Sequence, residues 1–89
     1  MNKLNEQGQK IVAAIQAGIA AMTPARWQEE AEKEAQFEDE GEWFAPEFAA
    51  ARAATEGLSW DFDGWRNTLE YLETGSGRIG GVSLLEVSR

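Results

Sequence analysis

The chain has 89 residues and a net charge of −8, from 16 acidic and 8 basic side chains. This length predicts one domain with a small core, and the excess of carboxylates argues against nucleic acid or anionic membranes as direct ligands. The absence of cysteine and histidine excludes disulfides and thiolate chemistry and removes the commonest general base and nitrogen metal ligand, so we expect a binding protein without a cofactor or metal, not an enzyme.

Residues 3–22 are predicted to form the main core helix. One face of this helix is apolar, with Leu4, Ile11, Ile15, Ile19 and Met22 at helical spacing. Asn2 or Asn5 is positioned to cap its start. Ala14, Gly18 and Ala21 form a second, flat strip that another backbone can approach closely. Intramolecular packing is the preferred explanation of this strip, and a homodimer interface is the alternative.

The same N-terminal segment resembles a secretory signal in outline, because Lys3 and Lys10 precede an apolar run. Glu6, Gln9 and Gln16 weaken that resemblance. The apolar run is also too short to span a bilayer. We therefore expect a cytoplasmic protein.

Thr23 and Pro24 predict the start of a second helix, because threonine is a good N-cap and proline fits the first helical position. The helix is expected to run to about Glu38 or Glu40, with Trp27 as its anchor in the core. Gly41 then weakens or ends it.

Residues 29–42 carry eight of the sixteen carboxylates. Four of these lie four residues apart, namely Glu30, Glu34, Glu38 and Glu42. In a continuous helix they would form one row, in which each adjacent pair repels by roughly 0.2–0.5 kcal/mol. Two interpretations remain open: a solvated face that keeps the protein soluble, or a rigid imitation of a phosphate row. Gly41 is expected to turn Glu42 towards the aromatic pair Trp43 and Phe44.

A third helix is predicted over about 46–56, with Pro46 in its first turn and Gly57 after its end. A fourth is predicted over about 62–74, capped by Asp61 or Asp63. Residues 82–87 fit a short strand or a single helical turn. A strand there would have to pair with residues 78–79, with a loop or with a second molecule.

Six of the nine aromatic residues fall between Trp43 and Trp65. Most of them are expected in the core of so small a chain. Trp43 and Trp60 lie in connecting segments, however, so one or both are candidates for an exposed contact with a partner. The predicted fold is therefore an all-α domain over residues 1–89, with four helices and a short extended or one-turn C-terminal segment.

The acidic composition, the absence of cysteine and histidine, and the acidic run beside Trp43 and Phe44 resemble a class of small inhibitors encoded by bacteriophages and mobile elements. This class includes anti-CRISPR proteins and DNA-mimicking anti-restriction proteins. The resemblance is one of overall character, without a shared motif. It implies an inhibitor that works in the host cytoplasm and occupies the basic nucleic-acid channel of a Cas complex.

Our functional hypothesis is an inhibitor that binds a basic protein surface, one that serves nucleic acid, such as that of a Cas complex. We expect no direct binding of this protein to nucleic acid or to a membrane. The predicted partner-binding residues are Glu30, Glu34, Glu38, Asp39, Glu42, Trp43 and Phe44. One alternative is an immunity protein or antitoxin that neutralises a basic toxin such as a nuclease. Another is a structural or regulatory homodimer.

Overall fold

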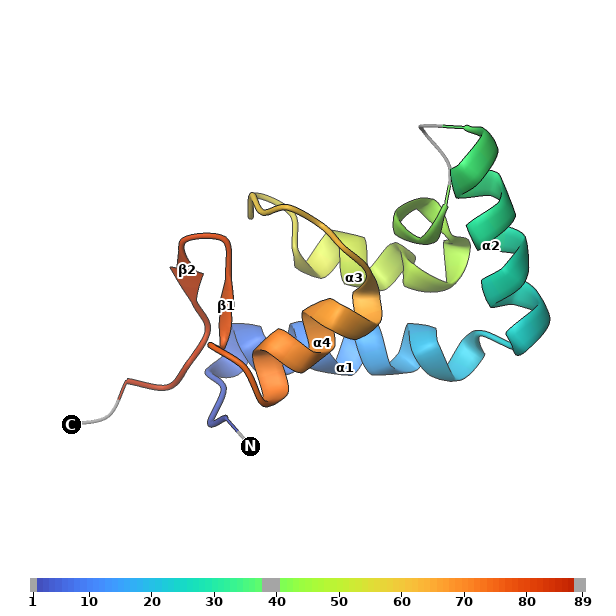
Figure 1. Ribbon diagram of the computed structural model, residues 1–89. Helices are drawn as coiled ribbons and strands as arrows, with labels where there is room; N and C mark the ends of the chain where they lie inside the picture. The colour runs from blue at the N-terminus through green and yellow to red at the C-terminus, as the bar shows by residue number, and fades with distance from the viewer. Residues whose placement is uncertain (1, 38–40, 88–89) are drawn as a thin grey trace.

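Four α-helices and two 3₁₀ turns make up more than half of the chain in a computed structural model that describes residues 2–37 and 41–87 (Figure 1). This confirms the predicted small, mostly α-helical fold. The elements are α1 (Glu6–Ala21), α2 (Pro24–Gln36), the 3₁₀ turns η1 (Glu42–Phe44) and η2 (Pro46–Phe48), α3 (Ala49–Ala54), α4 (Trp65–Glu73), β1 (Arg78–Ile79) and β2 (Val82–Ser83). No helix in the described ranges is long and apolar enough to cross a membrane.

Helix α1 is the central element, as predicted, and packs against α3, α4 and η2. Asn5 caps it, because its Oδ1 accepts a hydrogen bond of 2.8 Å from the backbone N–H of Gly8. Asn2 has a different role, since its side-chain amide donates to the carbonyl oxygens of Leu72 and Gly75. These bonds tie the N-terminal segment to the end of α4.

The predicted apolar face of α1 is the face that meets the core. Four of its five residues are buried, namely Leu4, Ile11, Ile15 and Met22, and Ile19 is half-buried. Gly18 lies against η2, where an added Cβ would stand 2.5 Å from Cδ1 of Phe48. At Gly18, the small-residue strip is therefore covered by another part of the same chain. This is intramolecular packing, the preferred explanation of the strip.

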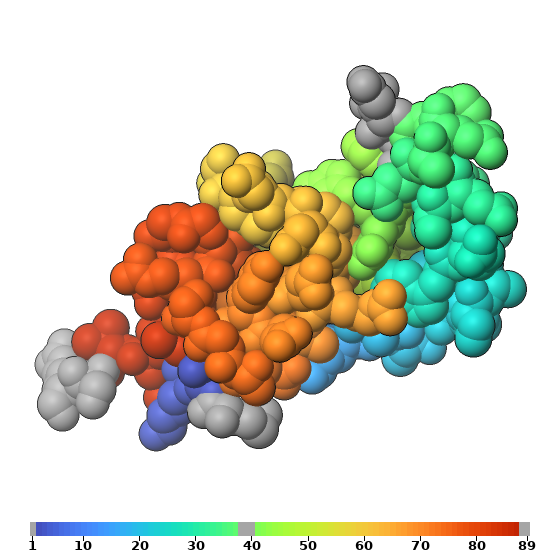
Figure 2. Space-filling model, in the orientation of Figure 1, coloured from blue at the N-terminus to red at the C-terminus, as the bar shows by residue number. Residues whose placement is uncertain are grey.

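Helix α2 begins as predicted, with Pro24 in its first turn and Thr23 Oγ1 accepting from the N–H of Arg26 at 3.2 Å. It ends at Gln36, two residues before the earlier of the two predicted ends, because Phe37 already has an extended backbone. Residues 38–40 lie outside the described ranges. The Cα atoms span 48 × 23 × 20 Å, and α2 stands at one end of this long axis with the hairpin at the other (Figures 1 and 2).

Aromatic side chains fill the centre of the core. Trp65 is fully buried and stacks on Phe48 on one side and Trp43 on the other, with centroid distances of 5.5 and 5.1 Å. Trp27 from α2 reaches the same cluster through Phe48, at 5.8 Å. Trp27 is thus the anchor of α2, as predicted.

The third predicted helix is divided into η2 and α3, and α3 ends at Ala54, two residues early. The fourth begins at Trp65, three residues later than predicted, and neither Asp61 nor Asp63 caps it. Its N-cap is Gly64, whose φ of 120° is a conformation that favours glycine. The predicted cap was wrong because a residue from η1 takes that role, as described below.

The C-terminal segment forms a strand, one of the two conformations left open by the sequence. Strands β1 and β2 pair antiparallel, with Arg78 opposite Ser83 and Ile79 opposite Val82. Leu84 follows β2 and is fully buried, and Leu85 pairs with Leu4 in an isolated bridge. The end of the described chain is thereby held against the start of α1.

Candidate functional site: an acidic and aromatic corner

Glu30, predicted to contact a partner, is instead buried, with only 3% of its surface exposed. Its Oε1 lies 2.9 Å from Nη2 of Arg26 and 3.5 Å from Nζ of Lys33. Arg26 also makes a two-pronged contact with Glu47 of η2, at 2.7 and 2.8 Å. Glu30 thus belongs to an ion-pair network that attaches α2 to η2, and the fold leaves almost none of it for another protein to touch.

The network shifts the pKa values of Arg26, Glu29, Lys33 and Glu47 in the direction that keeps them charged. Hydrogen bonds from Arg26 lower the pKa of Glu47 from 4.5 to about 2 and also lower that of Glu29. The carboxylates in turn raise the pKa values of Arg26 and Lys33, chiefly through Glu47 for the first and Glu29 for the second. The repulsion expected within the acidic run is therefore offset here by two cations.

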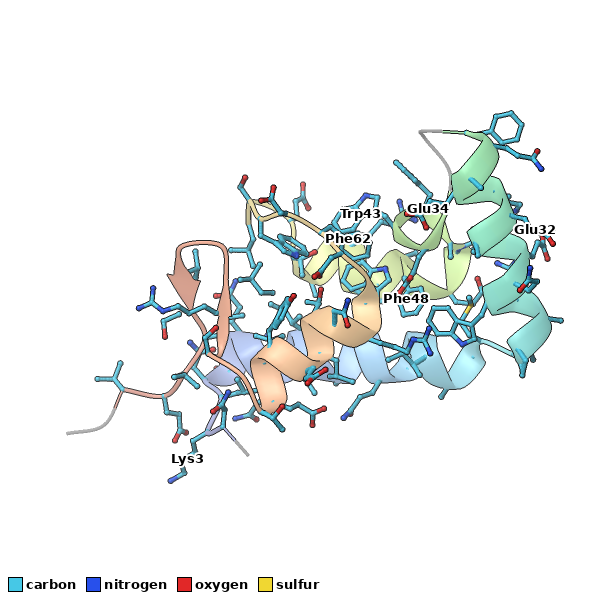
Figure 3. All side chains as sticks on the ribbon, viewed as in Figure 1. Lys3, Glu32, Glu34, Trp43, Phe48 and Phe62 are labelled. Atoms are coloured by element: carbon cyan, nitrogen blue, oxygen red, sulfur yellow. The ribbon has the colours of Figure 1, made fainter. Side chains whose placement is uncertain are left out.

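Glu34 has a different position from Glu30, since its side chain is exposed. Figure 3 shows it on the side of α2 that faces η1, whereas Glu32 points away on the opposite side. Gly41 passes so close that a Cβ there would lie 2.9 Å from Cβ of Glu34. The next two predicted residues, Glu38 and Asp39, lie outside the described ranges.

Glu42 folds back onto α4. Its Oε1 accepts a hydrogen bond of 2.7 Å from the backbone N–H of Trp65, the first residue of that helix. A carboxylate at a helix N-terminus satisfies a free N–H and interacts favourably with the helix dipole. Glu42 is half-buried, so it caps α4 while keeping part of its side chain at the surface.

Trp43 packs against the core, whereas Phe44 faces outward. Trp43 is half-buried and meets Trp60 and Phe62 edge to face, at centroid distances of 5.6 and 4.9 Å. Phe44 turns outward, with 44% of its surface exposed. The predicted aromatic anchor therefore has one residue that is built into the core and one that is open to a partner.

A hollow of about 360 Å³ opens beside Trp43. It is lined by Trp43, Leu58, Ser59, Trp60 and Phe62. We call it the aromatic hollow. Its walls come from η1 and from the segment between α3 and α4, and Figure 3 shows Trp43 and Phe62 side by side there. The position of Trp60 in a connecting segment was the sequence signal for this surface, whereas no signal singled out Leu58 or Phe62.

Carboxylates that lack a cationic partner accompany these rings. Glu34, Glu42, Asp61 and Asp63 make no ion pair with any other residue in the described part of the chain. We define the acidic–aromatic corner as Glu34, Glu42, Trp43, Phe44 and the aromatic hollow. Its charge is uncompensated and its rings are partly open, a combination that suits a cationic and partly apolar contact surface.

The described residues contain no group of three or more histidine, cysteine, aspartate or glutamate side chains arranged to hold a metal ion. Comparisons with models of protein families, with curated proteins and with solved structures gave no match.

Proposed function

We propose that this protein binds a basic surface of another protein through the acidic–aromatic corner, and that it thereby inhibits a complex that handles nucleic acid. The observation that carries the proposal is the placement of partly exposed rings beside carboxylates without cationic partners. Surfaces that hold DNA or RNA are rich in lysine and arginine. They are the natural complement of a chain with a net charge of −8.

The two parts of the corner have different tasks in this proposal. The carboxylates of Glu34 and Glu42 attract the basic surface over a distance and align it, which raises the association rate. Phe44 and the aromatic hollow supply an apolar contact from which water is excluded, which slows dissociation. A continuous row of glutamates is not required, and the inward position of Glu30 and the end of α2 at Gln36 favour a corner over a row.

The test begins with cross-linking and mass spectrometry in the native host to identify the partner, followed by titration calorimetry with the purified complex. Glu34→Lys should weaken binding by about tenfold or more, because it places a cation against a basic surface. Phe44→Ala should weaken it by a similar factor through lost apolar contact. The matched control is Glu86→Lys, an identical charge change in the segment that follows β2, and β2 and α2 lie at opposite ends of the molecule (Figure 1). Its contact with Lys3, at 3.8 Å, is an exposed ion pair that contributes little to stability.

The proposal also predicts competition, since duplex DNA or guide RNA bound to the complex should exclude the protein. Equal binding by the corner variants and the Glu86→Lys control would contradict the assignment of the site. An identified partner that is a toxin, released from inhibition by the same corner variants, would favour the alternative of an immunity protein or antitoxin.

A further inference from the structure

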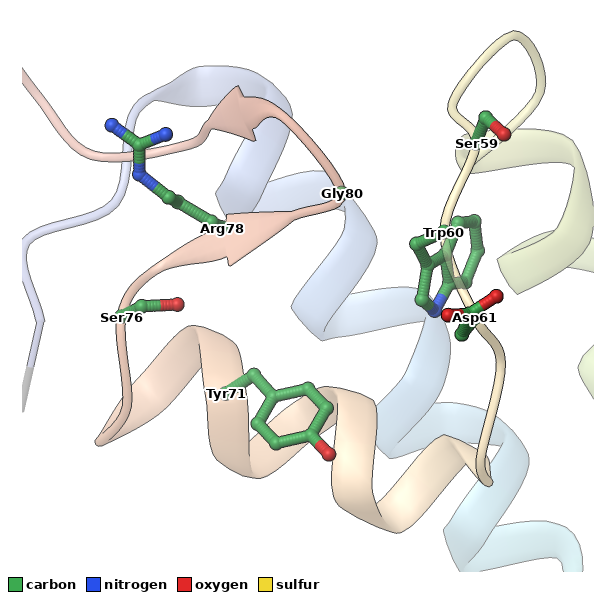
Figure 4. Close-up of a pocket in the computed structure, with 7 residues that line it drawn as sticks. All are labelled: Ser59, Trp60, Asp61, Tyr71, Ser76, Arg78 and Gly80. Carbon is green, nitrogen blue, oxygen red and sulfur yellow. The ribbon is translucent and has the colours of Figure 1, made fainter.

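A second hollow, of about 600 Å³, lies on the other side of the segment that leads into α4. Figure 4 shows it between that segment, α4 and β1. Trp60 and Asp61 form one wall, Tyr71 projects from α4, and Ser76 and Arg78 belong to the opposite wall. We call it the Tyr71 hollow. Ser59 and Trp60 also line the aromatic hollow, so the two hollows are neighbours.

The lining of the Tyr71 hollow contains one carboxylate, from Asp61, and one cationic residue, Arg78, and Asp63 adds a second carboxylate beside Tyr71. Asp61 is exposed and forms no ion pair within residues 2–37 and 41–87. The hydroxyl of Tyr71 donates a hydrogen bond of 2.6 Å to Oδ2 of Asp63, which places a second carboxylate at the mouth. Arg78 contributes its aliphatic stem, because Figure 4 shows its guanidinium directed away from the hollow.

The electrostatic environment of Tyr71 agrees with this description. The hydrogen bond to Asp63 raises the pKa of Tyr71, and burial and the charges of Asp63 and Glu70 raise it further. The negative charges of Asp63 and Glu70, which oppose a phenolate, also favour a cation near Tyr71. The hollow therefore combines carboxylates, a hydroxyl and aromatic rings, without an inward-pointing positive charge.

We propose that the Tyr71 hollow receives the side chain of an arginine from the partner protein. This arginine is the residue that anchors the partner, and the inference rests on the proposed function. A guanidinium is planar, so it can lie against the ring of Trp60 or Tyr71 while its N–H groups donate to Asp61. Lysine offers a compact, strongly hydrated charge that cannot stack in this way. A segment of the partner that crosses the Trp60 wall reaches the aromatic hollow as well.

The site can be tested without the partner, by NMR titration of the intact protein with N-acetyl-arginine amide. N-acetyl-citrulline amide is the matched probe, because it has nearly the same shape but no charge. We expect the arginine probe to shift the indole N–H signal of Trp60 and the backbone signals of Asp61 and Ser76, and to bind at least about fivefold more tightly than the citrulline probe. Equal binding of the two probes would overturn the proposal.

Variants then assign the contacts to individual groups. Asp61→Asn should weaken binding of the arginine probe by about tenfold, because it removes the charge-assisted hydrogen bond. Tyr71→Leu should weaken binding by about threefold or more, while Tyr71→Phe, which keeps the ring, should stay within about twofold of the wild type. Glu56→Gln, an exposed change in the turn after α3 and outside the lining of both hollows, is the control. Unchanged binding by Asp61→Asn and Tyr71→Leu would refute the site.

The same variants separate this inference from the proposed function. If Glu34→Lys and Phe44→Ala weaken binding to the purified partner while Asp61→Asn and Tyr71→Leu do not, the corner stands and the arginine site is wrong. If all four variants weaken it and Glu56→Gln does not, both are supported. If none weakens it, both are wrong.

Discussion

Arg26 binds three carboxylates at once. The shortest contacts of its guanidinium are 2.7 Å to Glu47, 2.9 Å to Glu30 and 3.0 Å to Glu29. Five N–H donors in one plane make this possible, and lysine could not reproduce the arrangement. Glu30 and Glu47 are the more enclosed of the three acids, with side-chain exposures of 4% and 18%. Their charges are tolerated in the fold because Arg26 is present.

The Arg26 network predicts a loss of stability in acid. The pKa of Glu47 is lowered from 4.5 to about 2 in the folded protein. The folded state therefore binds this proton less readily than the unfolded chain does, so the stabilisation is fully present above about pH 5 and is lost as the pH falls towards 2. Guanidinium chloride unfolding at pH 7, 4 and 2.5 should show a falling free energy of unfolding for the wild type.

The Glu47→Gln variant isolates the contribution of this carboxylate. It should be less stable than the wild type at pH 7 by roughly 1–3 kcal/mol, the range for a hydrogen bond to a charged group. The difference between the two proteins should shrink as the pH approaches 2, because protonated Glu47 then resembles glutamine. A difference that is constant between pH 7 and 2.5 would show that the charge of Glu47 does not stabilise the fold.

Glu42 is predicted to matter for stability as well as for binding. Its carboxylate is the only side-chain cap that the described structure provides for the first N–H of α4. Glu42→Ala should reduce the free energy of unfolding by about 1–2 kcal/mol, and Glu42→Gln, which keeps an acceptor oxygen, by less. Glu32→Gln, an exposed change on α2, should stay within about 0.5 kcal/mol of the wild type. Urea unfolding followed by circular dichroism measures all three.

At the scale of elements, helix α1 has a glycine, Gly18, at the point where it packs against η2. Gly18 meets Phe48 and the carbonyl oxygen of Glu47, which would lie 2.5 and 2.9 Å from an added Cβ. Alanine is favoured over glycine in a helix by up to about 1 kcal/mol. The contact with η2 opposes that preference, since an added methyl must displace a buried ring or backbone.

We therefore expect Gly18→Ala to destabilise the protein by about 1–2 kcal/mol, against its helix propensity, because overpacking costs more than the propensity contributes. Thermal unfolding of Gly18→Ala, Phe48→Leu and the double variant tests this as a cycle. The double variant should be more stable than the sum of the single effects predicts, since the smaller side chain makes room for the methyl. Additive effects would mean that Gly18 and Phe48 do not compete for space.

The ends of helices were predictable where the capping residue is close in the sequence, and less predictable where a distant residue caps the helix. Thr23 with Pro24 and Asn5 with Gly8 are caps that can be recognised from adjacent residues. The start of α4 was misplaced because its cap, Glu42, lies 23 residues before Trp65 in the sequence. Asp61 and Asp63 carry the right side chains for a cap at the right distance from the helix, but Asp63 accepts a bond from Tyr71 instead.

The candidate site was predictable to a similar extent. The pairing of Arg26 with Glu30 at i, i+4 is visible in the sequence, but the burial of Glu30 depends on Glu47 from η2, which only the tertiary structure brings near. The aromatic character of the corner followed from composition. The aromatic hollow in this corner forms because the segment between α3 and α4 folds over Trp43. No periodic pattern in the sequence predicts the path of such a segment.

At the scale of the whole molecule, the proposed binding would use charge and apolar contact at different stages. The net charge of −8 acts over a Debye length, whereas Phe44 and the aromatic hollow act only on contact. The Debye length falls from about 10 Å at 0.1 M salt to about 3 Å at 1 M. Salt and substitution should therefore alter different rate constants of the same complex.

The final prediction follows from this separation and is measured by stopped-flow association with the purified partner. Raising salt from about 0.1 to 1 M should reduce the association rate constant by about tenfold or more and change the dissociation rate constant by less than about threefold. Glu34→Lys should lower the association rate at low salt and flatten its dependence on salt. Phe44→Ala should leave association nearly unchanged and accelerate dissociation, because it removes contact area without changing charge. The opposite result would be a salt dependence in the dissociation rate constant alone, with Glu34→Lys and Phe44→Ala changing that same rate constant. It would show that the carboxylates and the rings form one short-range contact, without attraction at a distance.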